Sequence, residues 1–166
     1  MLENTKTLSD LRPVTDKDHT FLLTLYASTR SAELAVTGWS NEQKIFFLQS
    51  QFQLQHNHYQ QHFSTAKFHI IEKDKLPIGR LYYGWENNNL RLIDIVLLPE
   101  YQRKGIGGRL IRELMDLVGA RKGKLLLHVD INKPARDWYL RLGFLPENAE
   151  ASLKNGVYQQ LQWSSV

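Results

Sequence analysis

A basic loop that carries glycines is the part of this sequence best suited to bind a charged ligand. The loop, Gln102-Arg103-Lys104-Gly105-Ile106-Gly107-Gly108-Arg109, follows an apolar run from Leu90 to Leu98 and opens a stretch of helical periodicity. Glycine lets a backbone approach a ligand closely, and the first N–H groups of a helix lack intrahelical partners. A strand, a glycine loop and a helix in this order therefore predict a cradle for phosphate groups.

The glycine spacing excludes two other kinds of nucleotide-binding loop. Gly108 follows Gly107 directly instead of three residues later, which excludes the dinucleotide fingerprint. No Gly-Lys-Ser/Thr follows, which excludes a P-loop. Between residues 100 and 124, seven basic side chains stand against three acidic ones. This positive field favours a polyphosphate ligand, although solvated side chains on a helix face would give the same pattern.

A second stretch of mixed polar and aromatic residues lies downstream, and it reads Asn132-Lys133-Pro134-Ala135-Arg136-Asp137-Trp138-Tyr139-Leu140-Arg141-Leu142-Gly143-Phe144. Its pattern is Asn-x-x-Ala-x-x-x-Tyr-x-x-x-Gly-Phe, and the loop has the pattern Gln-x-x-Gly-x-Gly. Together the two patterns resemble the signatures of the Gcn5-related N-acetyltransferase (GNAT) family. The resemblance covers residues 67–146, whereas the N-terminal helices agree only in outline.

The resemblance implies acetyl-CoA as the acyl donor and assigns roles to the matching residues. The backbone N–H groups from Arg103 to Gly108 would hold the pyrophosphate, and the main chain of Leu97 and Leu98 would pair with the pantetheine arm. The implied cofactor-binding residues are Leu97, Leu98, Gln102, Arg103, Lys104, Gly105, Ile106, Gly107, Gly108, Arg109 and Asn132. Tyr139 matches the position that protonates the departing CoA thiolate, which a phenol is able to do. Asn132 would equally serve as a plain helix N-cap, and Tyr139 as a ring packed under its helix.

A general base is also needed, because an amine acceptor is protonated at neutral pH and only its free form attacks. Asp94 is the candidate, since it is the only acid in the apolar run that ends at the glycine loop. Burial there would favour a proton-accepting role. The alternative is that Asp94 pairs with Arg91, with another arginine or with backbone amides and serves structure alone.

The acceptor pocket of such folds generally forms between the first two helices and the last strands. The candidate substrate-binding residues in those regions are Tyr26, Arg30, Glu33, Trp39 and Tyr83. Arg30 and Glu33 lie one helical turn apart, so they would either bind a substrate's carboxylate and amine or bridge each other. His58 and His62 share a helix face, but no acid pattern accompanies them, and we expect no metal site.

Hydrophobic periodicity predicts the elements that would position these residues. We expect strands at Leu8–Val14, Phe68–Glu72, Ile78–Trp85, Leu90–Leu98, Leu125–Val129, near Gly143–Leu145 and at Gly156–Trp163. We expect helices from Thr15 to about Glu33, from Glu42 to about Tyr59, from Ile106 to Val118, and from Asn132 to about Leu142. The second of these has an apolar stripe of Ile45, Phe46, Leu48, Phe52 and Tyr59. A crossover helix joins Leu90–Leu98 to Leu125–Val129, so these two strands must be parallel.

The element order is therefore β-α-α-β-β-β-α-β-α-β-β, which predicts an α/β fold: a mixed sheet in a three-layer α-β-α arrangement. This order coincides with the topology of the acyl-CoA N-acyltransferase fold of the GNAT family. The sequence shows no linker and no internal repeat, so we expect one domain over residues 1–166.

Composition sets the remaining expectations. The chain has no cysteine, which excludes disulfides and cysteine nucleophiles. Residues 1–12 are polar, and no apolar run approaches the roughly 20 residues that a membrane span needs. We therefore expect a cytoplasmic protein without a membrane partner. The oligomeric state stays open, a homodimer included.

These observations predict an N-acetyltransferase that joins acetyl-CoA and a small-molecule or peptide amine in a ternary complex, where the amine attacks the thioester directly. One alternative is a toxin-like acetyltransferase acting on aminoacyl-tRNA, which a pI of 9.3 permits. No basic stripe with interleaved aromatic residues accompanies the loop, so a nucleic-acid partner is not expected. The other alternative is a CoA-binding regulatory module without turnover. The sequence names neither the acceptor nor the length of the acyl group.

Overall fold

A seven-stranded mixed sheet forms the centre of the molecule in the computed structural model, which describes residues 10–147 and 157–165. The strands are β1 (Leu11–Pro13), β2 (Lys67–Lys73), β3 (Leu76–Glu86), β4 (Asn89–Leu97), β5 (Lys124–Asp130), β6 (Leu145–Pro146) and β7 (Tyr158–Ser164). The helices are α1 (His19–Ala35), α2 (Asn41–His62), α3 (Ile106–Ala120) and α4 (Ala135–Arg141), with short 3₁₀ turns η1 (Asp16–Asp18) and η2 (Pro99–Tyr101). The order of elements is the predicted one. Residues 8 and 9 of the first predicted strand and residue 156 of the last lie outside the described residues.

The strand order is β1-β2-β3-β4-β5-β7-β6, and β4–β5 is the parallel pair among the strands that the structure describes. All other neighbouring strands run antiparallel. The crossover through α3 accounts for this parallel pair, as the sequence predicts. The predicted α/β fold with a mixed sheet is therefore confirmed.

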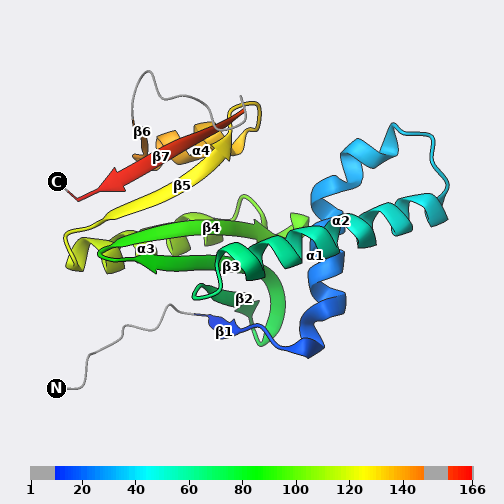
Figure 1. The fold of residues 1–166 in the computed structure, drawn as a ribbon, viewed down its shortest axis with the longest axis horizontal. Helices are drawn as coiled ribbons and strands as arrows, with labels where there is room; N and C mark the ends of the chain where they lie inside the picture. Colours follow the sequence, from blue (N-terminus) through cyan, green and yellow to red (C-terminus); the bar gives the residue numbers. More distant parts are fainter. Residues whose placement is uncertain (1–9, 148–156, 166) are drawn as a thin grey trace.

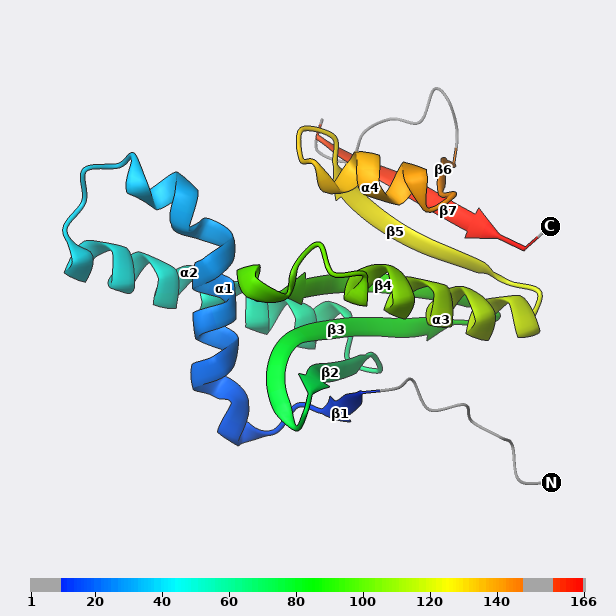
Figure 2. The same cartoon turned by 180° about the vertical axis from the view of Figure 1, so that it is seen from behind.

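The sheet splits between β4 and β5. Only Leu90 and Arg91 of β4 pair with β5, at Leu125 and Leu126. The register of β4 against β3 shifts at Ile93, because Tyr82 lies opposite Asp94 while Tyr83 lies opposite Leu92. Such a bulge bends its strand. Beyond it β4 and β5 diverge, and Figures 1 and 2 show the gap that opens between them.

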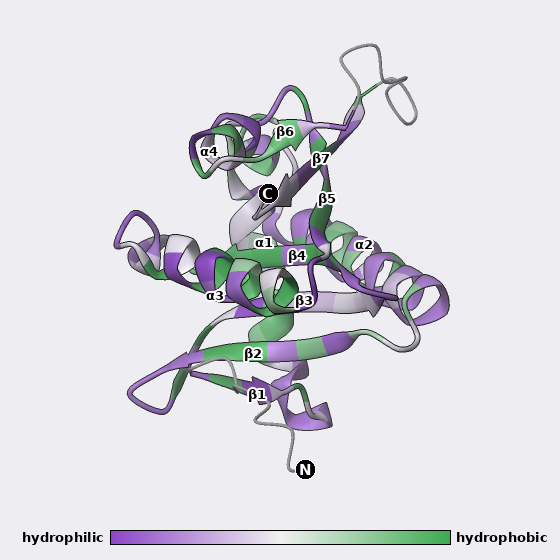
Figure 3. Cartoon of the chain, turned by 90° about the vertical axis from the view of Figure 1, so that its left-hand side faces the viewer, coloured by the Kyte–Doolittle hydropathy of each residue, from purple (hydrophilic) through white to green (hydrophobic). Residues whose placement is uncertain are grey.

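Helices cover both faces of the sheet. Figure 3 shows α3 and α4 on one side and α2 on the other. One face of α3 is fully apolar, and its buried residues are Leu110, Ile111, Leu114, Met115 and Val118. They pack on Leu81, Leu92 and Leu125 from the strands in the larger hydrophobic core. The resulting layer holds the N-terminus of α3 at the end of β4.

Helices α1 and α2 enclose a smaller core with β2, formed by Leu22, Tyr26, Phe52 and Ile70. Ser40 caps α2, accepting a hydrogen bond from the Gln43 backbone N–H at 3.2 Å. The predicted apolar stripe of α2 is wrong at Ile45 and Phe46, which are 54% and 74% exposed. The reason is that the α1–α2 connection projects past the sheet, as Figure 1 shows, so the first turns of α2 have no strand to cover.

Candidate active site

The wide end of the split in the sheet brings three elements together. The end of β4, the N-terminus of α3 and the helix α4 all lie there (Figures 1 and 2). The β5 strand is paired along its whole length with β7 on its other side. Within the part of the chain that the structure describes, the edge of β4 that faces β5 therefore has no strand partner beyond Arg91, and it is available to an extended ligand.

The glycine loop turns tightly into α3. Gly105 is the N-cap residue and has a φ of 82°, a conformation that L side chains rarely adopt. Arg103 also has a positive φ, 60°. A Cβ on Gly107 would lie 3.3 Å from the ring of Trp138, so this glycine lets α4 pack against the start of α3. The loop thus presents the first N–H groups of α3 at the wide end, as a phosphate cradle requires.

The residues that join β4 to the loop are held by hydrogen bonds. The side-chain amide of Gln102 donates to the Leu97 carbonyl oxygen at 2.9 Å, and the Leu98 N–H donates to the Ile78 carbonyl at 2.9 Å. Because successive residues of a strand point their backbone groups in opposite directions, the Leu97 N–H faces the gap beside β5. Leu97 therefore offers a backbone donor to a ligand in the gap, whereas the Leu98 N–H is already occupied.

A buried ion pair lies beside the gap. The Arg80 guanidinium donates to Asp94 Oδ2 through its Nε at 2.7 Å and through a second nitrogen. Arg80 also donates to Gln55 Oε1 of α2 at 3.0 Å. The Arg80 side chain is 4% exposed and that of Asp94 is 21% exposed. Burial lowers the pKa of Arg80, but Asp94, Tyr82 and Tyr59 together outweigh burial, so the pKa of Arg80 is raised.

The sequence allows Asp94 to pair with Arg91 or with another arginine. The structure shows that the partner is another arginine, Arg80 of β3. Both contacts of Arg80 go to the same carboxylate oxygen, Oδ2. Among the described residues, no hydrogen bond reaches Oδ1, and this atom is not sealed from solvent. The ion pair therefore orients the carboxylate and leaves one oxygen to accept a proton.

Tyr139 lies in α4 and points into the larger core, where its ring contacts Phe144 with centroids 5.5 Å apart. Burial raises the pKa of the Tyr139 hydroxyl above its ordinary value, and the charge of Asp94 raises it further. The two catalytic candidates thus lie within electrostatic range of each other although 45 residues separate them in sequence. In the described part of the chain the hydroxyl forms no hydrogen bond, so its proton is available to a ligand.

Two tyrosines surround the same ion pair. Tyr59 of α2 and Tyr82 of β3 meet at right angles with centroids 5.7 Å apart. Burial raises the pKa of Tyr59, and so does the charge of Asp94. The Arg80 guanidinium lies 5.1 Å from the centroid of the Tyr82 ring. The sequence predicts Tyr59 only as part of the apolar stripe of its helix, whereas Arg80 could have been found as the lone charge within the apolar strand Ile78–Trp85.

Asn132 is not the N-cap of α4, because the helix starts at Ala135 and Pro134 is its N-cap. This corrects the predicted start of the helix. Proline fits the N-terminal turn, where its missing N–H costs no hydrogen bond. The Asn132 N–H donates to Asp130 Oδ1 at 2.9 Å, so Asn132 sits in the turn that follows β5. Its proposed contact with the pantetheine arm remains a prediction.

The five candidate substrate residues do not form one cluster. Arg30 donates to Glu33 Oε2 at 3.0 Å and to the Tyr26 hydroxyl at 2.6 Å, so these three satisfy one another. Trp39 packs on Phe47 at the projecting α1–α2 tip and is 40% exposed. Tyr83 is buried in the core beneath α3, on the opposite face of the sheet from Tyr82.

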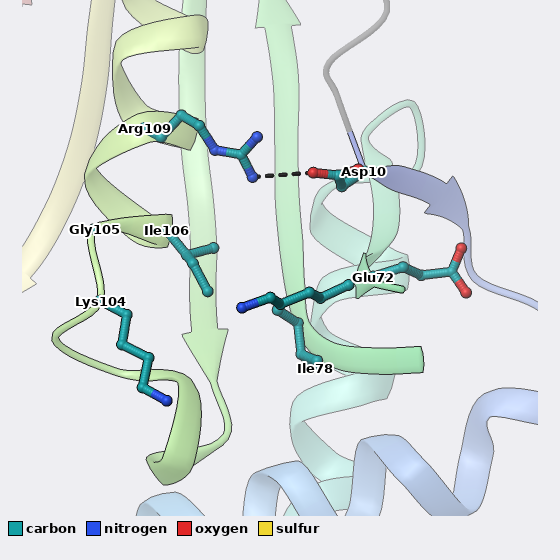
Figure 4. A pocket seen from close by; sticks show the side chains of 8 residues that line it. Asp10, Glu72, Ile78, Lys104, Gly105, Ile106 and Arg109 are labelled. Carbon is teal, nitrogen blue, oxygen red and sulfur yellow. Dashed lines mark hydrogen bonds and ion pairs between the residues drawn. The ribbon is translucent and has the colours of Figure 1, made fainter. Parts of the chain in front are cut away.

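Two cavities adjoin these elements. A recess of about 230 Å³ lies beside the glycine loop, and Figure 4 shows Lys104 and Arg109 on one side of it and Asp10 and Glu72 on the other. A second cavity, of about 470 Å³, lies between α1, α2, β2 and β3 and is lined mainly by aromatic rings, among them Phe52, Phe68 and Tyr82. The recess carries the charged side chains, so it is the cavity that suits an anionic ligand.

Two of the three histidines of α2 contact each other. The rings of His58 and His62 stack with centroids 4.2 Å apart, and His62 Nδ1 lies 3.0 Å from the His58 carbonyl oxygen. Within residues 10–147 and 157–165, no group of three or more His, Cys, Asp or Glu side chains is arranged to hold a metal ion. The same residues include no helix with the length and apolarity to cross a membrane.

Comparison with known sequences identifies the chain's relatives. The model of the acetyltransferase (GNAT) family matches residues 34–144. Thialysine N-epsilon-acetyltransferase of Bos taurus is 42% identical over 65 residues, which cover 37% of this chain and 38% of that protein. The Sus scrofa protein of the same name is 35% identical over 66 residues, covering 38% of each. The matched part thus spans less than two fifths of the length of either relative.

Solved structures share the fold over nearly the whole chain. The PaiA N-acetyltransferase of Thermoplasma acidophilum, in complex with coenzyme A, matches with a TM-score of 0.64 and 19% identity, covering 93% of this chain and 97% of that one. A chimera of the Vibrio cholerae spermidine N-acetyltransferase SpeG with a second protein, hSSAT, matches with a TM-score of 0.61 and 22% identity, covering 93% of each chain.

Proposed function

Because the chain belongs to the GNAT acetyltransferase family, we propose that it transfers an acetyl group from acetyl-CoA to an amine. The observation that carries this proposal is the split between β4 and β5 at the N-terminus of α3, with Asp94 and Tyr139 beside it. The family match includes both the glycine loop and the stretch that holds Tyr139. When bound, acetyl-CoA supplies a thioester, whose carbonyl carbon is open to attack by an amine.

The described residues fit this donor. The backbone N–H groups from Arg103 to Gly108 hold the pyrophosphate at the start of α3, and the αL conformation of Gly105 shapes the turn. The pantetheine arm would pair with the edge of β4 beyond Arg91, where Leu97 offers its N–H. Asn132 contacts the arm from the turn after β5.

Two side chains move protons in this proposal. Asp94 Oδ1 accepts the proton that the amine must lose, while Arg80 holds the other oxygen, Oδ2. Tyr139 keeps its proton throughout the neutral pH range because burial and Asp94 raise its pKa. Its hydroxyl then protonates the thiolate as the thioester breaks. No covalent intermediate on the enzyme is needed, in keeping with the absence of cysteine.

The acceptor is an amine whose ammonium form approaches Asp94. A carboxylate flanked by tyrosine rings suits such a cation, because it combines charge attraction with cation–π contact. The names of two relatives, a thialysine acetyltransferase and a spermidine acetyltransferase, point to the same chemistry. We propose small molecules with a primary amine on an alkyl chain as the first acceptors to test.

Thermal unfolding with and without acetyl-CoA tests the donor site. We expect a clear rise in melting temperature, because a ligand that binds only the native state stabilises it. Gly105→Ala should weaken this response, since a left-handed conformation costs an L residue about 1–2 kcal/mol. Gly119→Ala, the same change at the other end of α3, should leave it intact. The absence of any stabilisation by acetyl-CoA would contradict the donor assignment.

Release of the CoA thiol, measured across polyamines, amino acids, aminoglycosides and N-terminal peptides, tests the reaction. We expect turnover with at least one alkyl amine and only slow thioester hydrolysis without an acceptor. Binding of acetyl-CoA without turnover on any amine would instead favour a CoA-binding regulatory module.

A further inference from the structure

Two lysines from different elements converge on the recess beside the glycine loop. Lys73 ends β2 and Lys104 lies in the loop itself, 31 residues later. Their ammonium groups lie 6.0 and 5.9 Å from the centroid of the same ring, that of Tyr101. Two positive charges placed around one ring at the edge of the same recess favour the binding of an anion there.

The acidic residues of the recess do not neutralise these lysines. Glu72 forms an ion pair with Arg12 at 3.1 Å, and Asp10 forms one with Arg109 at 3.1 Å, the contact drawn in Figure 4. Among the described residues, neither Lys73 nor Lys104 takes part in an ion pair. The recess therefore has surplus positive charge next to the helix N-terminus.

The size of the recess limits what it holds. About 230 Å³ is below the roughly 300–1,000 Å³ typical of sites that enclose a drug-sized ligand, but it is ample for one phosphate group. Gly105 and Ile106, which line the recess, also begin α3. A phosphate here would therefore lie beside the pyrophosphate cradle and be part of the same ligand.

We propose that Lys73 and Lys104 bind the 3′-phosphate of the donor and thereby make the protein selective for CoA over dephospho-CoA. This inference rests on the proposed function, because it takes acetyl-CoA as the ligand of the loop. The 3′-phosphate is the phosphate group of CoA outside the pyrophosphate, and it carries up to two negative charges. Two ammonium groups from separate elements contact it, while the cradle holds the pyrophosphate through backbone N–H groups.

Affinity measured by calorimetry tests the proposal without reference to turnover. The ligands are CoA and dephospho-CoA, which differ only in the 3′-phosphate. We expect the wild-type protein to bind CoA about 10-fold or more tightly than dephospho-CoA, as charge-assisted contacts to one phosphate would give. This preference should shrink as salt is added, since both ammonium groups are near the surface.

The variant Lys73→Ala/Lys104→Ala should bring the two affinities to within about 3-fold, because it should weaken CoA binding much more than dephospho-CoA binding. Lys67→Ala, at the opposite end of β2, removes a lysine outside the recess and should preserve the preference. Equal wild-type affinities for CoA and dephospho-CoA would overturn the inference, and so would a preference that survives the double variant. Failure of both ligands to bind would contradict the proposed function itself.

Discussion

The two ends of β4 carry one arginine–carboxylate pair each, in opposite surroundings. At the end where β4 pairs with β5, Arg91 binds Glu86, whose side chain is 46% exposed, and contacts His128 of β5. At the end where the strands diverge, Asp94 binds Arg80, which is 4% exposed. An arginine–carboxylate pair therefore lies at the end where β4 and β5 are paired, and a second one lies toward the end where these strands diverge.

This difference shows how backbone geometry decides what a charged pair can do. The Arg91–Glu86 pair is the more exposed of the two, so water screens its charges. It lies where β4 is hydrogen-bonded to β5. The buried pair lies beyond the bulge at Ile93, where the edge of β4 has no strand partner. Burial raises the pKa values of Tyr59 and Tyr139, and the Asp94 carboxylate of this pair raises both further.

Asp94→Asn should have the largest effect, because it removes the proposed base and leaves Arg80 buried without its partner. We expect kcat/KM to fall about 10²- to 10³-fold at neutral pH and the free energy of unfolding to fall by about 3 kcal/mol. Activity should recover in part as the pH rises, because the acceptor amine then loses its proton to solvent. Steady-state thiol release across pH and urea unfolding would measure the two effects. An unchanged pH profile would remove the base assignment even if stability falls.

The double variant Arg80→Met/Asp94→Asn separates chemistry from stability. Replacing both partners removes the unpaired charge, so much of the lost stability should return. If Asp94 is the base, activity should stay low in this variant. Recovery of activity together with stability would mean that Asp94 acts only through the fold.

Tyr139→Phe should have the next largest effect. It should lower turnover and leave CoA affinity and stability nearly unchanged. We expect kcat to fall about 10²-fold while the affinity for CoA stays within about 2-fold. The ring and its packing on Phe144 remain, so the free energy of unfolding should change by less than about 1 kcal/mol. Burst and steady-state thiol release, together with calorimetric binding, would check this split. Full turnover in the variant would show that Tyr139 serves packing only.

Much of the wide end could be predicted because its signals are local. The glycine loop and the stretch from Asn132 to Phe144 are continuous in sequence, and Asp94 stands out as the one acid of an apolar strand. The predicted parallel pairing of β4 and β5 follows from the crossover helix alone. Such signals locate the donor site before any coordinates are known.

The remaining features depend on tertiary contacts that no local pattern marks. The bulge at Ile93 breaks an apolar run without any glycine or proline, so the sequence gives no sign of the split. Gln55 and Tyr59 reach Arg80 and Asp94 from α2, whose polar and apolar residues are too interleaved to show which face is buried. The stripe predicted there failed at Ile45 and Phe46 because the first turns of α2 project past the sheet, which no local pattern indicates.

A third ion pair, remote from the gap, tests whether burial alone explains the Asp94 effects. Arg12 binds Asp18 at 2.8 Å, and the Arg12 hydrogen bond is the main reason that the pKa of Asp18 is lowered to about 2. Because this pKa lies below that of the unfolded chain, the pair stabilises the fold above about pH 4 and loses its effect as the pH falls toward 2. Asp18→Asn should cost about 1–2 kcal/mol at pH 7, given that Arg12 is about one third exposed.

Denaturation of wild type and Asp18→Asn at pH 7 and pH 2.5 would measure this difference, which should shrink at the lower pH. Turnover at pH 7 should match the wild type under conditions where both proteins are folded. Loss of turnover in this variant as large as in Asp94→Asn would mean that the contrast between the ends of β4 reflects general fragility.

Glu86→Gln should have the smallest effect and provides the matched control for Asp94→Asn, since each variant removes the carboxylate of an arginine pair near β4. Glu86 is exposed and Arg91 keeps its contact with His128. We therefore expect less than about 0.5 kcal/mol of lost stability and unchanged kcat and KM. If Glu86→Gln lowers kcat/KM tenfold, the paired end of β4 is also part of the site, and the division of the strand into a structural and a chemical end is wrong.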